Sequence, residues 1–344
     1  MSVLRRMAPM IHQQNVVLQK SPIAWKKSLQ QVVRSVSELL VLLNLSIDDV
    51  DCDPTFPLRV PREFIAKMKP GDPHDPLLRQ VLPLQEEHRL VEGYTTDPVG
   101  EKAANPAPGL LHKFPSRVLL TPTGACAVHC RYCFRRHFPY SENTPSRFEW
   151  DKSLDYVRQD PNIREVILSG GDPLSLQDAA IGQLIGLIAA IPHIQLLRFH
   201  TRFPVMIPSR ITPELLQNIQ CRLPTTFVLH INHPNEIDTA LKEAVQCLKQ
   251  AGILVLNQSG LLKGVNDSVD TLIELSYQLF AAGILPYYMN CLDKVAGAHH
   301  FDLPLTTARQ LMKAQQEALP GYLMPRWMVE VPGEKSKIPL QFFL

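Results

Sequence analysis

Between residues 117 and 290 the sequence alternates short apolar runs with longer amphipathic ones, and this alternation constrains the fold more than any other feature. The short runs are rich in β-branched residues, as strands are, and the longer runs have helical spacing of apolar residues. The expected strands are 117–121, 165–169, 195–200, 226–230, 253–257 and 285–290, and the expected helices are 151–158, 176–190, 212–220, 236–250 and 267–282. Such alternation predicts right-handed βα units and a parallel sheet. Six units predict an incomplete, TIM-like (βα)6 barrel of the α/β class.

Three cysteines, Cys126, Cys130 and Cys133, follow the first expected strand with the spacing C-x3-C-x2-C. Functional groups of parallel barrels lie at the carboxyl ends of strands, so this loop is well placed for chemistry. A closed zinc site and a cubic iron–sulfur cluster both normally take four ligands. Three thiolates on one loop therefore indicate a cluster with one iron open to a small chelating molecule. The alternative is a zinc site completed by His129 or His137.

The later strands also end in residues that are capable of chemistry. The second expected strand runs into Gly170, Gly171 and Asp172, where glycines let backbone groups approach a ligand closely. The remaining strands end in the segments 200–202, 230–236, 257–259 and 290–293. One polar strand end is most simply a cap, but polar groups at all of these ends predict a single functional rim.

The composition excludes several classes of function. The 344 residues are 45% hydrophobic and 20% charged, which is typical of a globular protein with a large core. A formal net charge of +2 gives no indication of nucleic-acid binding. The four cysteines outside the loop are scattered, which argues against a disulfide framework and favours a reducing, cytoplasmic location. No apolar run reaches about 18 residues, so no transmembrane helix and no membrane partner is expected.

The region before the alternation is expected to be helical and to end in a loop. One helix is expected over 22–45, a second from Pro61, and a short third over 75–81, before a Pro- and Gly-rich wrapping loop from 94 to 109. Residues 1–37 carry basic side chains and no acid, as organellar transit peptides do. A basic tail that leads into a helix is the preferred interpretation of that segment.

Several motifs, in order along the chain, resemble the lysine 2,3-aminomutase family of radical S-adenosylmethionine (SAM) enzymes. The resemblance is greatest to the branch that makes β-lysine for elongation factor P. The matching segments are 58–62, 75–81, 108–113, 130–138, 169–174, 231–236, 256–259 and 286–301. The resemblance implies an N-terminal helical region (1–108), a radical SAM (βα)6 core (109–315) and a C-terminal segment that binds pyridoxal phosphate (316–344).

The resemblance also implies two cofactors at the rim of the barrel. A [4Fe–4S] cluster would be held by the three cysteines, Cys126, Cys130 and Cys133. SAM would chelate the open iron, and the positions that match its pocket are Gly170, Gly171, Asp172, His230 and Gln258. Arg202 and Asn232 match the same rim.

The family uses pyridoxal phosphate (PLP) as well, bound as a Schiff base to a lysine in a glycine-rich tail. Lys337, followed by an Ile-Pro pair, matches that lysine, and Lys335 is the alternative. The tail departs from the family's run of glycines at 334–336, so its loop is expected to differ in shape. Arg117 matches a position that contacts the cofactor phosphate.

The resemblance assigns both ends of an amino-acid substrate. Arg135 matches the arginine that pairs with the carboxylate, for which its planar fork is suited. Asp293 matches one acid that holds the far ammonium of lysine, and Glu330 matches a second, where aminomutases of free lysine carry aspartate. The extra methylene of Glu330 predicts a narrower pocket or a changed substrate preference.

The implied function is that of an isomerase, an aminomutase that converts L-α-lysine to β-lysine, as the R isomer, for elongation factor P and its lysyl ligase. Such a reaction needs an external one-electron reductant, and no nucleic-acid partner is expected. Two alternatives stay open at this point. One is a radical SAM enzyme that keeps the cluster but lacks PLP or acts on another amino acid, such as glutamate, and the other is a non-enzymatic, zinc-binding accessory of translation.

Overall fold

A single curved layer of strands organises the molecule. The computed structural model describes residues 24–52, 57–144 and 150–343, and within them one sheet of nine strands runs in the order β1 to β9. Strands β2 to β8 are parallel, whereas β1 and β9 pair antiparallel at the two edges. The strands are β1 (Leu110–Phe114), β2 (Arg117–Leu120), β3 (Glu165–Leu168), β4 (Leu196–Thr201), β5 (Thr225–Leu229), β6 (Leu254–Gly260), β7 (Leu285–Asn290), β8 (Arg326–Val329) and β9 (Ile338–Pro339).

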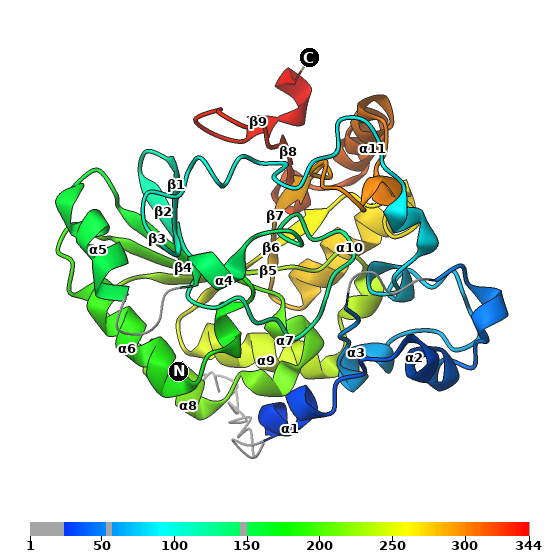
Figure 1. Cartoon of the computed structure of the whole chain (residues 1–344), viewed down its shortest axis with the longest axis horizontal. Helices are drawn as coiled ribbons and strands as arrows, with labels where there is room; N and C mark the ends of the chain where they lie inside the picture. Colours follow the sequence, from blue (N-terminus) through cyan, green and yellow to red (C-terminus); the bar gives the residue numbers. More distant parts are fainter. Residues whose placement is uncertain (1–23, 53–56, 145–149, 344) are drawn as a thin grey trace, which may run out of the picture.

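Helices connect the parallel strands and cover the outside of the sheet (Figure 1). They are α5 (Trp150–Gln159), α6 (Asp178–Ala189), α8 (Pro213–Ile219), α9 (Thr239–Gln250), α10 (Val269–Ala281) and α11 (Leu305–Ala318). Two short helices, α4 (Tyr140–Asn143) and α7 (Phe203–Met206), lie in the loops after β2 and β4. The strand order ends at β1 and β9 instead of closing on itself, so the architecture is a partial α/β barrel.

The six strands expected from the sequence are all present, as β2 to β7, and the five expected helices differ from the observed ones by at most three residues at either end. Strand β8 was not expected, because it directly follows Pro325 and its three apolar residues, 327–329, include only one that is β-branched. It extends the parallel series by one strand. The division of the chain at residues 108 and 315 stays a prediction, and β8 and β9 belong to the same sheet as the core.

The single helix expected over 22–45 is wrong. Two helices, α1 (Ala24–Gln30) and α2 (Val36–Leu42), replace it. Between them Val33 forms a bridge with Val60, with backbone N···O distances of 2.8 and 3.0 Å in the two directions. Ser35 then begins α2 by accepting a hydrogen bond from a backbone N–H of its first turn. The β-branched pair Val32–Val33 suits extended backbone better than helix, which explains the break.

The other N-terminal expectations fall partly outside the structure. The helix expected from Pro61 is the short α3 (Arg62–Ile65), and the segment 75–81 contains a 3-10 turn at 78–80. The transit-peptide alternative concerns mainly residues 1–23, which lie outside the described residues. In the described ranges, every helix is too short or too polar to cross a membrane.

Trp25 anchors the N-terminal helices to the barrel. Its side chain is 1% exposed, meets the ring of Phe203 edge-on at 5.9 Å, and stacks under the Arg210 guanidinium at 4.3 Å. Arg210 is itself buried, forms an ion pair with Asp178 at 2.6 Å and donates to the carbonyl of Leu174 at 2.7 Å. Helix α1 is therefore fixed to the loops after β3 and β4, which carry residues of the barrel rim (Figure 1).

We expect Trp25→Ala to lower the free energy of unfolding by about 3–5 kcal/mol, because a large buried ring is lost and the Arg210 cation loses its stacking partner. Thermal or urea unfolding would measure the change. Lys27→Ala, two residues further along and exposed, is the matched control and should change stability by less than about 0.5 kcal/mol. Equal effects of the two substitutions would show that α1 does not stabilise the barrel.

Candidate active site

The loops at the carboxyl ends of the strands surround a cavity of about 940 Å³. Most of the residues that the sequence assigns to a cofactor or substrate line this cavity, as does Arg202, whereas Asn232 does not. Besides Arg202, the assigned residues that line it are Arg117, Cys126, Cys130, Cys133, Arg135, Gly170, Gly171, Asp172, His230, Gln258, Asp293, Glu330 and Lys337. They come from strand ends throughout the sheet and from the C-terminal tail, so the parallel sheet brings together residues that are far apart in sequence.

The three cysteines of the loop after β2 are free thiols on the cavity wall. Burial raises the pKa of Cys133 to about 11 and raises that of Cys126 as well, so bare thiolates would be costly here. Within the described ranges, no cluster of three or more His, Cys, Asp or Glu side chains could hold a metal ion. A cubic cluster binds its thiolates through different iron atoms, so its ligands need not converge on one point. The fit of this loop to a cluster therefore rests on its soft donor set.

The two histidines considered as zinc ligands contact backbone carbonyl oxygens. His129 Nδ1 contacts the carbonyl of Pro57, and His137 Nε2 lies 3.1 Å from that of Ala296. Burial lowers the pKa of His129 below its ordinary value, even though the Pro57 contact raises it. Both rings tie the cysteine loop to neighbouring segments.

Gly170 and Gly171 pack against the chain itself. Gly171 N donates to the carbonyl of Thr123 at 2.9 Å, and a Cβ at residue 171 would lie 2.5 Å from the carbonyl oxygen of Ala125. Gly170 has φ +100°, which side chains rarely adopt. The sequence predicted glycines for close approach to a ligand, whereas the close approach seen here is to the backbone that leads into the cysteine loop.

The Asp172 carboxylate ties the ends of β3 and β4 together. Its Oδ2 accepts hydrogen bonds from the backbone N–H groups of Arg202 at 2.8 Å and Phe203 at 3.0 Å, and its Oδ1 accepts from the hydroxyl of Thr201 at 2.7 Å. Burial raises the pKa of Asp172 to about 6, although these bonds favour the ionised form. The carboxylate thereby fixes the start of the segment that carries Arg202.

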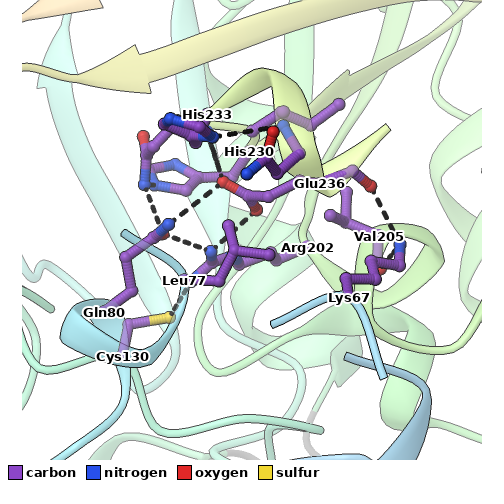
Figure 2. Close-up of polar contacts among 12 residues, drawn as sticks. Lys67, Leu77, Gln80, Cys130, Arg202, Val205, His230, His233 and Glu236 are labelled. Atoms are coloured by element: carbon purple, nitrogen blue, oxygen red, sulfur yellow. Dashed lines mark hydrogen bonds and ion pairs between the residues drawn. The ribbon is translucent and has the colours of Figure 1, made fainter. Parts of the chain in front are cut away.

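Arg202 is the centre of a buried polar network that reaches the cysteine loop (Figure 2). Its Nη1 donates to Cys130 Sγ at 2.8 Å, and its Nη2 donates to Gln80 Oε1 at 2.6 Å and to Glu236 Oε2 at 2.9 Å. Burial opposes ionisation of Glu236, but Arg202 and the N–H groups around it hold its pKa below the usual range. The network therefore joins a cysteine, the end of β4, the loop after β5 and the N-terminal region.

Gln80 is a part of this site whose role sequence reasoning missed. Its amide oxygen accepts hydrogen bonds from Arg202 and, at 3.0 Å, from Asn232 Nδ2, and its amide nitrogen donates to Glu236 at 3.2 Å. It is fully buried although it precedes the barrel in sequence. The signal was the segment 75–81, which matches the family but was assigned no role beyond a short helix.

His230 lies at the end of β5 and stacks on Tyr132, with 5.5 Å between ring centroids and 18° between ring planes. Burial, reinforced by the charge of Arg202, lowers the pKa of His230 to about 3, so the ring is neutral at physiological pH. Gln258 follows an irregularity in the pairing of β6 with β7, which shifts the register between Asn257 and Gln258. Such a bulge bends the strand and changes the direction of the side chains that follow it, here at the cavity wall.

A group of opposite charges forms around Lys337. Lys337 Nζ lies 3.1 Å from Glu330 Oε2 and donates to Asn290 Oδ1 at 3.0 Å. Glu330 also pairs with Lys113, a residue that the sequence analysis did not single out. Burial raises the pKa of Asp293 to about 7, although the charge of Lys337 acts in the opposite direction. Lys335, the alternative lysine, is exposed and does not line the cavity.

The two remaining arginines differ in how firmly they are held. Arg135 is buried and forms an ion pair with Glu101 at 2.6 Å, and its Nη1 donates to Ser169 Oγ at 3.0 Å. Arg117 lies over the ring of Phe114 at 4.4 Å and is half-buried on the cavity wall. Glu101 lies in the wrapping loop, where no periodic pattern marked it in the sequence.

Curated proteins with similar sequences share one name. "L-lysine 2,3-aminomutase" of Escherichia coli (strain K12) is 46% identical over 326 residues, 93% of this chain and 95% of that protein. The protein of the same name from Haemophilus influenzae is 47% identical, over 91% of this chain and 94% of that one. The one from Clostridium subterminale is 34% identical, over 92% of this chain and 77% of its own length.

Other comparisons are less informative. No family model matches the chain. Among solved structures, a radical SAM methyltransferase from Sphaerobacter thermophilus has a TM-score of 0.47 and 14% identity, with 64% of this chain and 68% of that one covered. Streptococcus suis SuiB, solved with its precursor peptide SuiA, has a TM-score of 0.46 and 16% identity, with 64% and 50% covered.

The relatives, together with the cysteine loop at the rim of a partial barrel, define a radical SAM enzyme. The chain belongs to the L-lysine 2,3-aminomutase family, and it is an isomerase. Membership implies a [4Fe–4S] cluster and SAM, and it sets aside the alternative of a non-enzymatic zinc protein.

We expect Gly171→Ala to displace the cysteine loop, because the added Cβ has backbone atoms of residues 124 and 125 at 2.5 Å. The variant should retain less than about half of the wild-type iron after anaerobic reconstitution and lose about 1–3 kcal/mol of stability. Gly186→Ala in α6 is the control, since its Cβ meets nothing within 4 Å and alanine favours helix. Full iron content in Gly171→Ala would mean that this contact does not position the cysteines.

Proposed function

We propose that the chain is a PLP-dependent radical SAM L-lysine 2,3-aminomutase, which converts L-α-lysine to (R)-β-lysine in the cytoplasm. Its product serves the modification of elongation factor P by a lysyl ligase, and its electron comes from an external one-electron reductant. The observation that carries the proposal is the joining, in one cavity, of the three-cysteine loop, the lysine Lys337 with its acids, and the buried fork of Arg135.

The cysteine side of the cavity has the donors for a cluster and its ligand. Cys126, Cys130 and Cys133 would hold the [4Fe–4S] cluster, and the rim residues Gly170, Gly171, Asp172, His230 and Gln258 would contact SAM. When bound, the cluster and SAM supply a hydrogen-abstracting radical, and PLP supplies an aldehyde that carries the amino group while it moves between two carbons of the substrate. The neutral His230 ring can accept or donate a hydrogen bond there without adding charge. The protein's part is to orient the reactants and to exclude water from them.

The tail side of the cavity suits PLP. Lys337 has a primary amine on the cavity wall and would hold the cofactor covalently. In the structure its ammonium is held by Asn290 and Glu330, which keep it in the cavity. Arg117, half-buried on the same wall, would bind the phosphate. Exposed Lys335 has neither of these surroundings.

The charged groups favour lysine over glutamate as the substrate. Arg135 would bind the carboxylate that every α-amino acid carries. Asp293 and Glu330 would hold the far ammonium of lysine, and they would repel the second carboxylate of glutamate. A raised pKa for Asp293 is what a carboxyl shows when it lacks a sufficient counter-charge, and a substrate ammonium would supply one. The link to elongation factor P is supported by the resemblance of the sequence motifs to that branch of the family.

The deciding experiment is anaerobic incubation of the reconstituted protein with L-lysine, SAM and a strong reductant, followed by chiral analysis of the products. We expect (R)-β-lysine, with SAM cleaved to 5′-deoxyadenosine. A second arm adds elongation factor P and its lysyl ligase, and the expected result is a mass increase on elongation factor P that depends on the aminomutase. Turnover of glutamate instead of lysine would contradict the substrate assignment, and the S isomer would contradict the stereochemistry.

Two neighbouring lysines provide matched variants for the cofactor site. Lys337→Ala should abolish β-lysine formation and the absorbance of covalently bound PLP while it leaves the iron–sulfur absorbance unchanged, because the lysine serves the tail side of the cavity. Lys335→Ala should retain activity within about twofold, since its side chain is exposed. The reverse outcome would move the PLP assignment two residues along the chain.

Asp293 makes lysine binding depend on pH. Below about pH 7 its carboxyl takes up a proton and cannot pair with the substrate ammonium, so affinity should rise as the pH rises through 7. Asp293→Asn should weaken binding by about a hundredfold or more and remove the pH dependence. Calorimetry with the cofactor-loaded enzyme, without reductant, would measure the affinity for lysine and its dependence on pH. Asp267→Asn, at an exposed position, is the control and should behave like wild type.

A further inference from the structure

Glu101 accepts hydrogen bonds from one edge of the Arg135 guanidinium. Its Oε2 accepts from Arg135 Nε at 2.8 Å, and its Oε1 accepts from Nη2 at 2.6 Å, which is a side-on bidentate pair. Both side chains are almost completely buried, with 6% and 7% of their surface exposed. Burial opposes the charge on Arg135, but Glu101 raises the pKa of the guanidinium above its ordinary value, so the guanidinium keeps its charge.

The pairing leaves part of the fork for another acceptor. A guanidinium has five N–H donors in a rigid plane. Nε and one N–H of Nη2 go to Glu101, and one N–H of Nη1 goes to Ser169 Oγ. Within the part of the chain that the structure describes, one N–H on each Nη nitrogen is left without a partner among the contacts of Arg135. These two nitrogens form the tip of the fork, and Arg135 lines the cavity.

The wrapping loop that carries Glu101 is fixed at several points. The backbone N–H of Glu101 donates to Asp97 Oδ1 at 2.8 Å, and the carbonyl of Val99 accepts from Lys113 Nζ at 2.7 Å. Thr95 forms a bridge with Val295, two residues beyond Asp293. A carboxylate on so constrained a loop can hold the arginine without paying much conformational entropy itself when substrate binds.

We propose that Glu101 is a positioning residue, which locks the Arg135 fork so that its Nη tip is presented to the substrate carboxylate. The inference rests on the proposed function, since it takes an α-amino acid as the substrate. Glu101 touches the arginine and acts through it. Without the carboxylate, a long side chain with several rotatable bonds would have to be ordered at each binding event, and affinity for the carboxylate would fall.

The test compares Glu101→Gln with wild type in equilibrium binding of L-lysine and of lysinamide, which lacks the carboxylate. Calorimetry on the cofactor-loaded enzyme without reductant measures binding, and turnover is measured separately. We expect Glu101→Gln to weaken lysine binding by about tenfold or more, because a charge-assisted bidentate bond is lost, and to leave lysinamide binding nearly unchanged. Glu101→Asp keeps the charge on a shorter side chain, and its affinity for lysine should lie between those of Glu101→Gln and wild type. Glu92→Gln, exposed and close by in sequence, is the control and should resemble wild type.

The outcomes separate three explanations. Tighter lysine binding in Glu101→Gln would show that Glu101 competes with the substrate, and equal weakening of both ligands with lower thermal stability would show a structural role alone; either overturns the proposal. In a double-mutant cycle with Arg135→Lys, the two substitutions should be strongly non-additive for lysine, and additive effects would also overturn it. If wild type binds lysine no better than lysinamide, the substrate assignment of Arg135 fails together with the inference, whereas failure only in the Glu101 variants leaves the proposed function intact.

Discussion

The buried ion pair of Arg202 with Glu236 is the interaction on which the site depends most. Neither charge could be left in this interior alone, because desolvation of a single buried ion costs several kcal/mol. The two charges compensate each other, and the two Nη nitrogens of the arginine donate to Glu236, to Gln80 and to Cys130. Since the three residues come from the end of β4, the loop after β5 and the N-terminal region, the position of the cysteine loop depends on all three segments being folded. The N-terminal region is thus part of the active site as well as a cover for the barrel.

The sequence predicted the barrel well and its edges poorly. Strands β2 to β7 were predictable because each is a β-branched run between helical patterns, and their polar ends were predictable as one rim because parallel strands end at the same side. Strand β8 has a single β-branched residue, Val329, and β9 is only two residues long, so neither produces such a signal. Lys337 could be assigned only through the resemblance, since nothing local distinguishes it from Lys335 until the fold places Lys337, half-buried, on the cavity wall and leaves Lys335 exposed. Glu101, Gln80 and Lys113 were missed because their partners are fixed by tertiary packing alone.

The charges around Lys337 balance among themselves. Two cations, Lys113 and Lys337, face two acids, Glu330 and Asp293, and Glu330 contacts both lysines. Commitment of Lys337 to a covalent cofactor would remove one positive charge and leave a net negative site, which a substrate ammonium could neutralise. The four groups are therefore balanced in charge in the unloaded protein, and the loaded protein would have a place for one further cation.

The open edge of the sheet has a mechanical consequence. Lys113 belongs to β1, at one end of the strand order, and Glu330 directly follows β8, near the other end, so their ion pair spans the seam where a closed barrel would have a strand ladder. A ladder is held by many cooperative backbone hydrogen bonds, whereas one side-chain pair can exchange its partner for water or for a phosphate. To part the two edges at this point would break a side-chain ion pair, but it would break none of the strand pairings of the described sheet.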